Sequence, residues 1–302
     1  MARILSVGVA TLDVVLSVNG YPGEDSEVRA HDMELRRGGN AANTAVVLAL
    51  LGHDCSWAGV TGAGSDGSRI QHELAAAGVK TNAARILGDG AVPTSYVLLN
   101  RENGSRTIVH HRALPEYGYD DFARINLRRF DWLHFEGRNV PETARMLRRA
   151  RDLVPGVPRS VEIEKSRHGI HQLYDLADVL LFSKDYALDA GYASAGALLQ
   201  DVGEDAPRAL IVCAWGTDGA WARSYRGEEY HSPAFPPETV VDTIGAGDAF
   251  NAGIIHGLVQ RRPLPEVLTA ASRLAGESCA RHGLDHLGTG LHGGPPRPAP
   301  PD

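Results

Sequence analysis

Four short apolar segments in the middle of the chain decide its fold: W-L-H-F-E at 132–136, R-S-V-E-I-E at 159–164, D-V-L-L-F-S at 178–183 and R-A-L-I-V-C-A-W at 208–215. Each has the length of a buried strand, and helical stretches lie between them. Strands that alternate with helices form βαβ units around a mostly parallel sheet. We therefore expect an α/β fold with a doubly wound sheet, flanked by helices and joined by right-handed crossovers.

The N-terminal third extends this pattern. R-I-L-S-V-G-V-A at 3–10 predicts a buried first strand, and S-W-A-G-V at 56–60 predicts a short one. Helices are expected over 40–52, which Gly52 closes, and over about 66–77, with Gly78 just beyond the end.

Other segments do not alternate with helices. Residues 14–36 contain β-like stretches, and 95–111 predict a hairpin whose turn is Asn103-Gly104. Segments at about 14–37 and 92–112 therefore predict a small separate sheet that acts as a lid. Near the C-terminus we expect two helices, at about 246–261 and 264–282. The Pro/Gly-rich residues 288–302 are expected to be disordered.

The composition is that of a soluble globular protein and excludes several classes. The 302 residues are 43% hydrophobic and 22% charged, with a formal net charge of -7, which argues against nucleic acid as a partner. No stretch reaches the roughly 18 apolar residues that a membrane helix needs. The three cysteines and thirteen histidines match no metal spacing, and free thiols favour a reducing cytoplasm.

The segment with the clearest chemistry is V-V-D-T-I-G-A-G-D-A-F-N-A-G at 240–253. Gly245-Ala246-Gly247 is expected to follow a strand and open a helix, so that backbone N–H groups and the helix dipole form an anion hole. Asp248 lies in the first turn of that helix. A carboxylate beside an anion hole suits phosphoryl transfer, in which it takes the proton of an attacking hydroxyl. The alternative is an ordinary helix start.

Two further features, the asparagines of segment 36–45 and Asp13, supply polar side chains that could bind a sugar. R-R-G-G-N-A-A-N-T-A at 36–45 places Asn40 and Asn43 three residues apart at the start of a helix, and asparagine both donates to and accepts from sugar hydroxyls. Asn40 could instead be a helix cap. Asp13 stands in what reads as an apolar first strand. Because burying an unpaired carboxylate is costly, Asp13 either faces a polar site at the end of the strand or sits at the sheet edge, and we expect the former.

Taken together, G-G-N-x-x-N followed by D-T-x-G-A-G-D-x-F resembles the ribokinase-like (PfkB-type) carbohydrate kinases over residues 1–287. Within that family the chain looks most like its ketohexokinase (fructokinase) branch, through P-G-E-D-S-E-V-R, H-F-E-G-R-N, S-V-E-I-E-K, F-S-K-D and V-C-A-W. The resemblance implies a ribokinase-like kinase domain of residues 1–287 that transfers phosphate from ATP, with Mg²⁺, to a ketohexose such as fructose. It also implies a homodimer joined through the lids.

The resemblance assigns roles residue by residue. Asp248 matches the catalytic base, and the anion hole is matched by Gly245, Ala246 and Gly247. Sugar-binding positions are matched by Asp13, Asp25, Gly39, Asn40 and Asn43, of which Asp25 would reach the neighbouring subunit's sugar. ATP-binding positions are matched by Arg106, Gly216, Thr217, Asp218 and Gly219. Without the resemblance, Arg106 reads as a surface arginine and the two glycines as a turn.

One departure concerns the metal. Many family members carry N-x-x-E at the end of a core strand, whereas this chain has Ser183-Lys184-Asp185-Tyr186, a departure that ketohexokinase-like members share. The resemblance therefore names no protein ligand for Mg²⁺, which sits largely on phosphates and water. It places a potassium ion near Asp242 and Thr243.

Two alternatives stay open. Another kinase of this fold would act on ribose, a keto-deoxy sugar acid or a nucleoside, and an acid substrate would require a fixed Arg or Lys in the sugar pocket. A sensor without catalysis would bind ATP and not turn it over.

Overall fold

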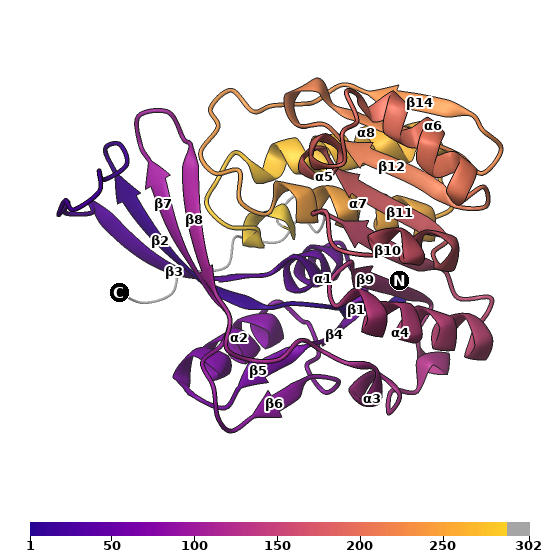
Figure 1. Ribbon diagram of the computed structural model, residues 1–302, viewed down its shortest axis with the longest axis horizontal. Coiled ribbons are helices and arrows are strands. Elements are labelled where there is room, and N and C mark those ends of the chain that lie inside the picture. The colour runs from indigo at the N-terminus through magenta and orange to yellow at the C-terminus, as the bar shows by residue number, and fades with distance from the viewer. Residues whose placement is uncertain (289–302) are drawn as a thin grey trace.

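The apolar segments quoted above are neighbouring strands of one central sheet (Figure 1). The structure is a computed structural model that describes residues 1–288. The order across the sheet is β14-β13-β12-β11-β10-β9-β1-β4, parallel from β12 to β4 and antiparallel at β13 and β14. Its strands are β1 (Arg3–Val7), β4 (Asp54–Ala58), β9 (Trp132–Glu136), β10 (Arg159–Ile163), β11 (Val179–Ser183), β12 (Leu210–Ala214), β13 (Ala220–Arg223) and β14 (Glu229–Ser232).

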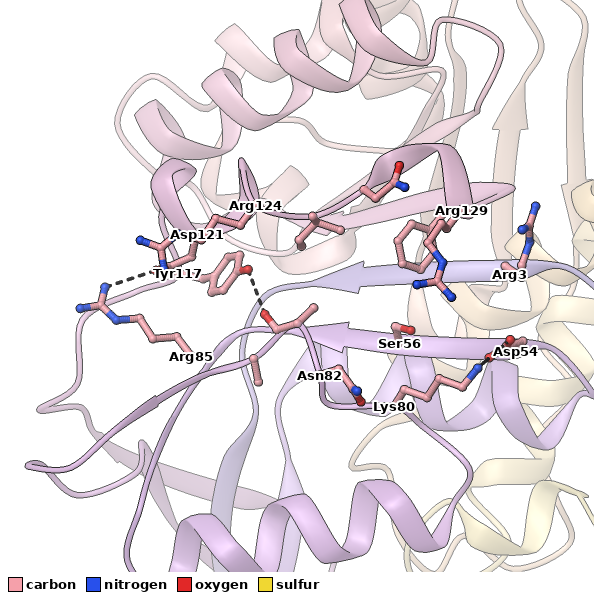
Figure 2. Close-up of a pocket in the computed structure, with 15 residues that line it drawn as sticks. Arg3, Asp54, Ser56, Lys80, Asn82, Arg85, Tyr117, Asp121, Arg124 and Arg129 are labelled. Atoms are coloured by element: carbon pink, nitrogen blue, oxygen red, sulfur yellow. Dashed lines mark hydrogen bonds and ion pairs between the residues drawn. The ribbon is translucent and has the colours of Figure 1, made fainter.

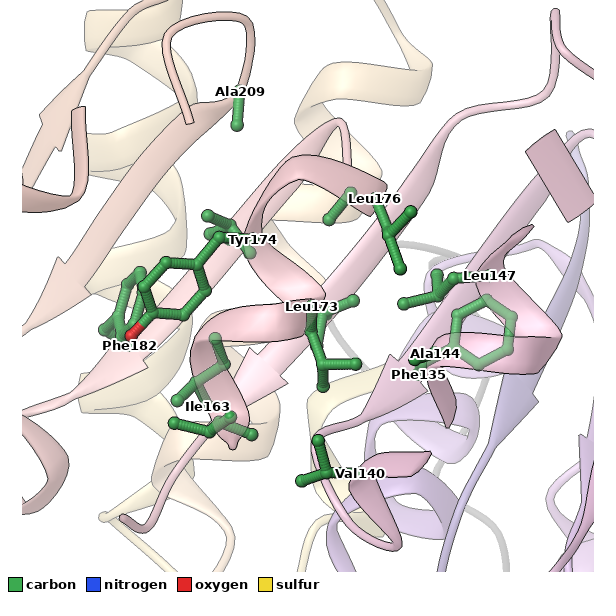
Figure 3. Packing of buried hydrophobic residues seen from close by; sticks show 14 of the residues in the cluster. Phe135, Val140, Ala144, Leu147, Ile163, Leu173, Tyr174, Leu176, Phe182 and Ala209 are labelled. Atoms are coloured by element: carbon green, nitrogen blue, oxygen red, sulfur yellow. The ribbon is translucent and has the colours of Figure 1, made fainter. Parts of the chain in front are cut away.

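Helices cover both faces of this sheet, as the alternating pattern predicts. One buried cluster joins the sheet to α4, α6 and η2, and Figure 3 shows Leu147 of α4 and Leu173 of η2 packed against strand residues such as Phe135. The other cluster joins the opposite face to α1, α7 and α8. The helices are α1 (Asn40–Leu50), α2 (Ser65–Ala76), α3 (Tyr119–Phe122), α4 (Val140–Leu153), α5 (Lys184–Asp189), α6 (Ala195–Asp205), α7 (Ala246–Val259), α8 (Leu264–Ser278), η1 (Leu127–Arg129), η2 (Ile170–Leu176), η3 (Gly216–Asp218) and η4 (Asp285–Gly288).

A second sheet of four strands projects from this body (Figure 1). Its order is β3-β2-β7-β8, from β2 (Thr11–Val18), β3 (Asp32–Gly38), β7 (Thr94–Asn100) and β8 (Arg106–His111). The small separate sheet expected from the sequence is therefore present, and its hairpin pairs β7 with β8 around residues 101–105. A third pairing, β5 (Val60–Gly62) with β6 (Arg85–Leu87), was not expected.

The structure corrects two local predictions. Asp13 does not lie in the first strand: β1 ends at Val7, and the chain then leaves the central sheet, so that Asp13 belongs to β2 of the second sheet. No strand precedes α7 either. After β14 the chain runs irregularly to Gly245, and the backbone N–H of Val241 donates to Cys279 O at the end of α8 instead of pairing in a sheet.

Other boundaries differ little. The last helix ends at Ser278 rather than near residue 282. The tail predicted to be disordered lies outside the described residues from 289 onward, and Gly288 closes η4. Within residues 1–288, no helix has the length and apolar character needed to cross a membrane.

Candidate active site

The carboxyl ends of the parallel strands meet the start of α7, and Asp248 lies in the first turn of that helix. Gly245 caps the helix with φ of 83°, a left-handed conformation that favours glycine. Gly247 is exposed, and a Cβ added there would meet nothing within 4 Å. Backbone N–H groups in the first turn of a helix have no partner inside the helix. The Ala246 N–H donates to Thr243 O at 3.4 Å. The anion hole at this end of α7 stays a prediction.

Asp248 is buried, and its carboxylate is held by α1. Asn43 Nδ2 donates to Asp248 Oδ2 at 2.8 Å, and Arg37 Nη1 donates to Asn43 Oδ1 at 2.8 Å. Burial raises the pKa of Asp248 well above the usual range of a carboxyl group, and the hydrogen bond from Asn43 opposes this effect. A carboxylate with a raised pKa is better matched to accepting a proton near neutral pH than an exposed aspartate is.

A second buried carboxylate lies beside the first. Glu162 of β10 accepts from Asn40 Nδ2 at 3.1 Å and from Asn251 Nδ2 at 3.0 Å, both through Oε1. Its Oε2 is buried and has no hydrogen-bond partner among residues 1–288. Burial and the negative charge of Asp248 raise the pKa of Glu162 well above its usual range. Two carboxyl groups with raised pKa values thus lie near each other, an arrangement that a proton or a cation stabilises.

A cavity of about 330 Å³ lies between the second sheet and the start of α1. Asp13 and Asn43 line it together with Arg36, Arg37 and Asp242. Thr11 Oγ1 donates to Asp13 Oδ1 at 2.9 Å, and burial raises the pKa of Asp13. The Asp13 carboxylate in this position requires glycine at residue 38, because a Cβ there would lie 2.1 Å from Asp13 Oδ2.

Two arginines of the second sheet reach the segment before α7. Arg36 of β3 pairs with the buried carboxylate of Asp242, and Arg106 of β8 donates to Thr243 Oγ1. The backbone N–H of Ile244 donates to Asp242 Oδ1 at 2.9 Å. The side chains of Asp242 and Thr243 thus connect the small sheet to the body of the protein.

The loop of Gly216, Thr217, Asp218 and Gly219 follows β12, at the same edge of the sheet as the other strand ends. Its first three residues form η3 and are exposed, and Gly219 adopts φ of 98° to turn the chain into β13. At the end of β11, Ser183 caps α5 by accepting from the Tyr186 N–H at 2.9 Å, and Tyr186 is buried. These two side chains serve the local fold.

The predicted residues are therefore only partly gathered. Asp13 and Asn43 line one cavity, and Asn43 bonds Asp248. Asn40 bonds Glu162 instead. Gly39 packs against the backbone that leads into β2, where a Cβ would lie 2.4 Å from Val9 O. Asp25 is exposed at the far end of the second sheet, with φ of 55°, and lines no cavity described here.

Sequence reasoning missed Arg37, Glu136, Glu162 and Asn251. Glu136 and Glu162 are register partners on β9 and β10, and Glu136 accepts the Val9 N–H at 2.8 Å. The sequence does place Glu136 and Glu162 at the carboxyl ends of predicted parallel strands, and polar residues at such ends meet at one edge of the sheet. Asn251 also lies three residues after Asp248 on one helix face. Among residues 1–288 there is no group of three or more His, Cys, Asp or Glu arranged to hold a metal ion.

Comparison with known proteins identifies the family of the chain. The chain is 38% identical to mouse ketohexokinase over 94% of this chain and 98% of that protein. It is 28% identical to the ATP-dependent ribose-1-phosphate kinase of Halopiger xanaduensis, over 94% of each. Its fold matches Arabidopsis thaliana ribokinase complexed with ribose and ATP with a TM-score of 0.77 at 20% identity, over 95% of each chain. The family model described as pfkB family carbohydrate kinase matches residues 1–287. The chain therefore belongs to the pfkB family of carbohydrate kinases.

Proposed function

We propose that the protein transfers the terminal phosphoryl group of ATP to a hydroxyl of a ketohexose, fructose being the first candidate and fructose 1-phosphate the product. The observation that carries this proposal is the buried contact between Asn43 and Asp248 at the N-terminus of α7. The 38% identity to ketohexokinase, over nearly the whole of both chains, supports the choice of sugar.

In the proposed reaction, Asp248 accepts the proton of the attacking sugar hydroxyl. Asn43 holds Oδ2 of this carboxylate, so Oδ1 is the oxygen that takes the proton. A bond forms between the sugar oxygen and the terminal phosphorus as the bond from that phosphorus to ADP breaks. Backbone N–H groups of Gly245, Ala246 and Gly247 stabilise the charge on the phosphoryl oxygens.

ATP is proposed to lie along the strand ends, between Gly216–Gly219 and the start of α7. Arg106 is close enough to this path to contact phosphate, since its guanidinium already bonds Thr243, two residues before Gly245. Mg²⁺ supplies neutralisation of phosphate charge and keeps most of its water. The unpartnered Oε2 of Glu162 fits the role of acceptor for such a water. A potassium ion near Asp242 and Thr243 stays a prediction; because both side chains bond arginines, it would rely on backbone carbonyls.

The cavity beside Asp13 favours a neutral sugar. Its lining holds five carboxylates (Asp13, Glu34, Glu73, Asp242, Asp285) and three arginines (Arg36, Arg37, Arg69). Arg36 and Arg37 are already engaged by Asp242 and Asn43. An acidic sugar would therefore face an excess of carboxylates, whereas hydroxyl groups can donate to them. Ribose or a nucleoside remains the runner-up, because relatives of this chain include an ATP-dependent ribose-1-phosphate kinase and a nucleoside kinase.

A homodimer through the second sheet is proposed on the strength of its outer face. Residues on the face opposite Asp13 are paired across the four strands: Val14 with Leu35 and Tyr96, and Tyr96 with Val109. Met33, Tyr96 and Val109 are exposed by 62%, 48% and 63%. An apolar sheet face of this kind is a typical interaction surface. In such a dimer, Asp25 of one subunit would approach the sugar of the other.

The test is ADP release with ATP and Mg²⁺ against fructose, other ketoses, ribose, keto-deoxygluconate and adenosine. Fructose should give the highest kcat/KM. Asp248→Asn should lower kcat by about 10²–10⁴-fold while sugar affinity changes by only a few-fold. Turnover near the wild-type rate in this variant would exclude Asp248 as the base. A different preferred sugar would change the substrate and leave the mechanism intact.

A further inference from the structure

A cavity that Asp248 does not line lies elsewhere in the described part of the chain. It measures about 700 Å³ and is bordered by the first residues of β1 and β4, by the segment 82–85, and by residues 124–130. Arg3 and Asp54 begin their strands, and Phe130 comes shortly before β9. The cavity runs alongside β4, the outermost parallel strand of the central sheet, from Asp54 at the start of the strand to Arg85 and Tyr117 near its end. Asp248 is not among its lining residues.

Positive charge dominates the lining. Five basic side chains and two carboxylates line it, in a protein whose formal net charge is -7. A third carboxylate, Asp131, lies outside the lining and pairs with Arg3 at 2.8 Å. The basic side chains are Arg3, Lys80, Arg85, Arg124 and Arg129, and the carboxylates are Asp54 and Asp121. A concave surface lined by one sign of charge raises the local concentration of oppositely charged molecules.

The carboxylates neutralise only part of this charge. Lys80 Nζ lies 2.6 Å from Asp54 Oδ1, and Arg85 Nη1 lies 3.2 Å from Asp121 Oδ2. Arg124 is 3.9 Å from the same Asp121, which it shares with Arg85. Arg129 has no side-chain partner among residues 1–288. One guanidinium is thus free, and a second shares its carboxylate.

Figure 2 shows how these groups are arranged. Arg129 extends from the wall above the sheet toward Ser56, while Lys80 and Asn82 lie on the wall below. Arg85, Arg124 and Asp121 gather at the other end of the cavity, with Tyr117 between the two groups. Asn82 and Ser56 add neutral donors with no side-chain hydrogen bond recorded in the described residues. Guanidinium, ammonium, amide and hydroxyl donors together suit the oxygens of a phosphate group.

The volume of the cavity and the net charge of the chain indicate the class of ligand. A volume of about 700 Å³ suits a small organic molecule. The negative net charge of the chain disfavours nucleic acid. We propose that this cavity, beside the outer strand β4, binds a small phosphorylated anion, whose phosphate oxygens contact Arg129 and Lys80.

The test is calorimetric titration of the full-length protein with pyrophosphate and with inorganic phosphate, as wild type and as Arg129→Ala. Pyrophosphate will also bind at the ATP site, so the informative quantity is the difference between matched variants. Arg128→Ala is the control, because Arg128 is an exposed neighbour in the same short helix that does not line the cavity. Both variants lose one positive charge.

We expect Arg129→Ala to weaken one class of pyrophosphate sites by about tenfold, the effect of losing one hydrogen bond to a charged group. Arg128→Ala should stay within about twofold of wild type, and both variants should keep wild-type kcat and melting temperature. Arg124→Glu, at the other end of the cavity, should weaken the same class. Equal affinities in the two alanine variants would overturn the proposal, as would pyrophosphate binding at the ATP site alone.

Discussion

Asn43→Ala tests the link between α1 and the proposed base. The substitution removes the 2.8 Å hydrogen bond from Asn43 Nδ2 to Asp248 Oδ2, and alanine keeps the helix intact. A hydrogen bond to a charged group contributes about 1.5–3 kcal/mol. At 1.36 kcal/mol for each factor of ten, its loss lowers the ionised fraction of Asp248 by about tenfold to a hundredfold at any pH below its pKa.

The sign follows from the role of the group. Burial already raises the pKa of Asp248, and the hydrogen bond from Asn43 restrains that rise. The base works only when ionised, so the acid limb of the pH profile of kcat/KM should move to higher pH in Asn43→Ala. Part of the lost activity should return as the pH is raised.

The assay is ADP release measured from acid to alkaline pH for the wild type, Asn43→Ala and Thr44→Ala. Thr44 is the control, because it lies next to Asn43 in α1 and its buried Oγ1 makes no hydrogen bond. The acid limb of the Thr44→Ala pH profile should coincide with that of the wild type. If Asn43→Ala lost activity equally at every pH, Asn43 would act on the sugar alone, and the coupling argued here would be refuted.

Three further outcomes are expected. Gly39→Ala should destabilise the fold by about 3 kcal/mol or more in denaturant titrations, because a Cβ would lie 2.4 Å from Val9 O. Gly52→Ala, at a similar positive φ of 88° with nothing within 4 Å, should cost only about 1–2 kcal/mol, and equal losses would contradict the steric explanation. Arg106→Ala should raise KM for ATP about tenfold in steady-state assays and leave KM for the sugar within about twofold; the reverse pattern would remove Arg106 from the ATP site. Val109→Glu should convert the proposed dimer to a monomer in light scattering, whereas Leu188→Glu, at a residue exposed by 50% on α5, should leave the oligomeric state unchanged. A dimer in both variants would exclude the outer sheet face as the interface.

The sequence by itself determined the central architecture. Four apolar strands separated by helices leave few arrangements other than a parallel sheet covered on both faces, because each strand must bury both of its sides. The helix start at Gly245-Ala246-Gly247, with Asp248 in the first turn, was also predicted from the sequence, although the strand expected before it is absent. Small residues at a helix start followed by a carboxylate describe a local structure, and local structure depends on neighbours in the chain.

Only the tertiary structure decided which side chains meet. Asn40 and Asn43 share a helix face, yet one bonds Glu162 and the other bonds Asp248, and this choice depends on where β10 and α7 are packed against α1. Asp13 was placed in the wrong strand, because residues 3–18 are apolar enough to read as one strand. The partners of Arg36 and Arg106 lie 206 and 137 residues away. Contacts between such distant segments follow from the packing of whole elements, which spacing along the sequence does not encode.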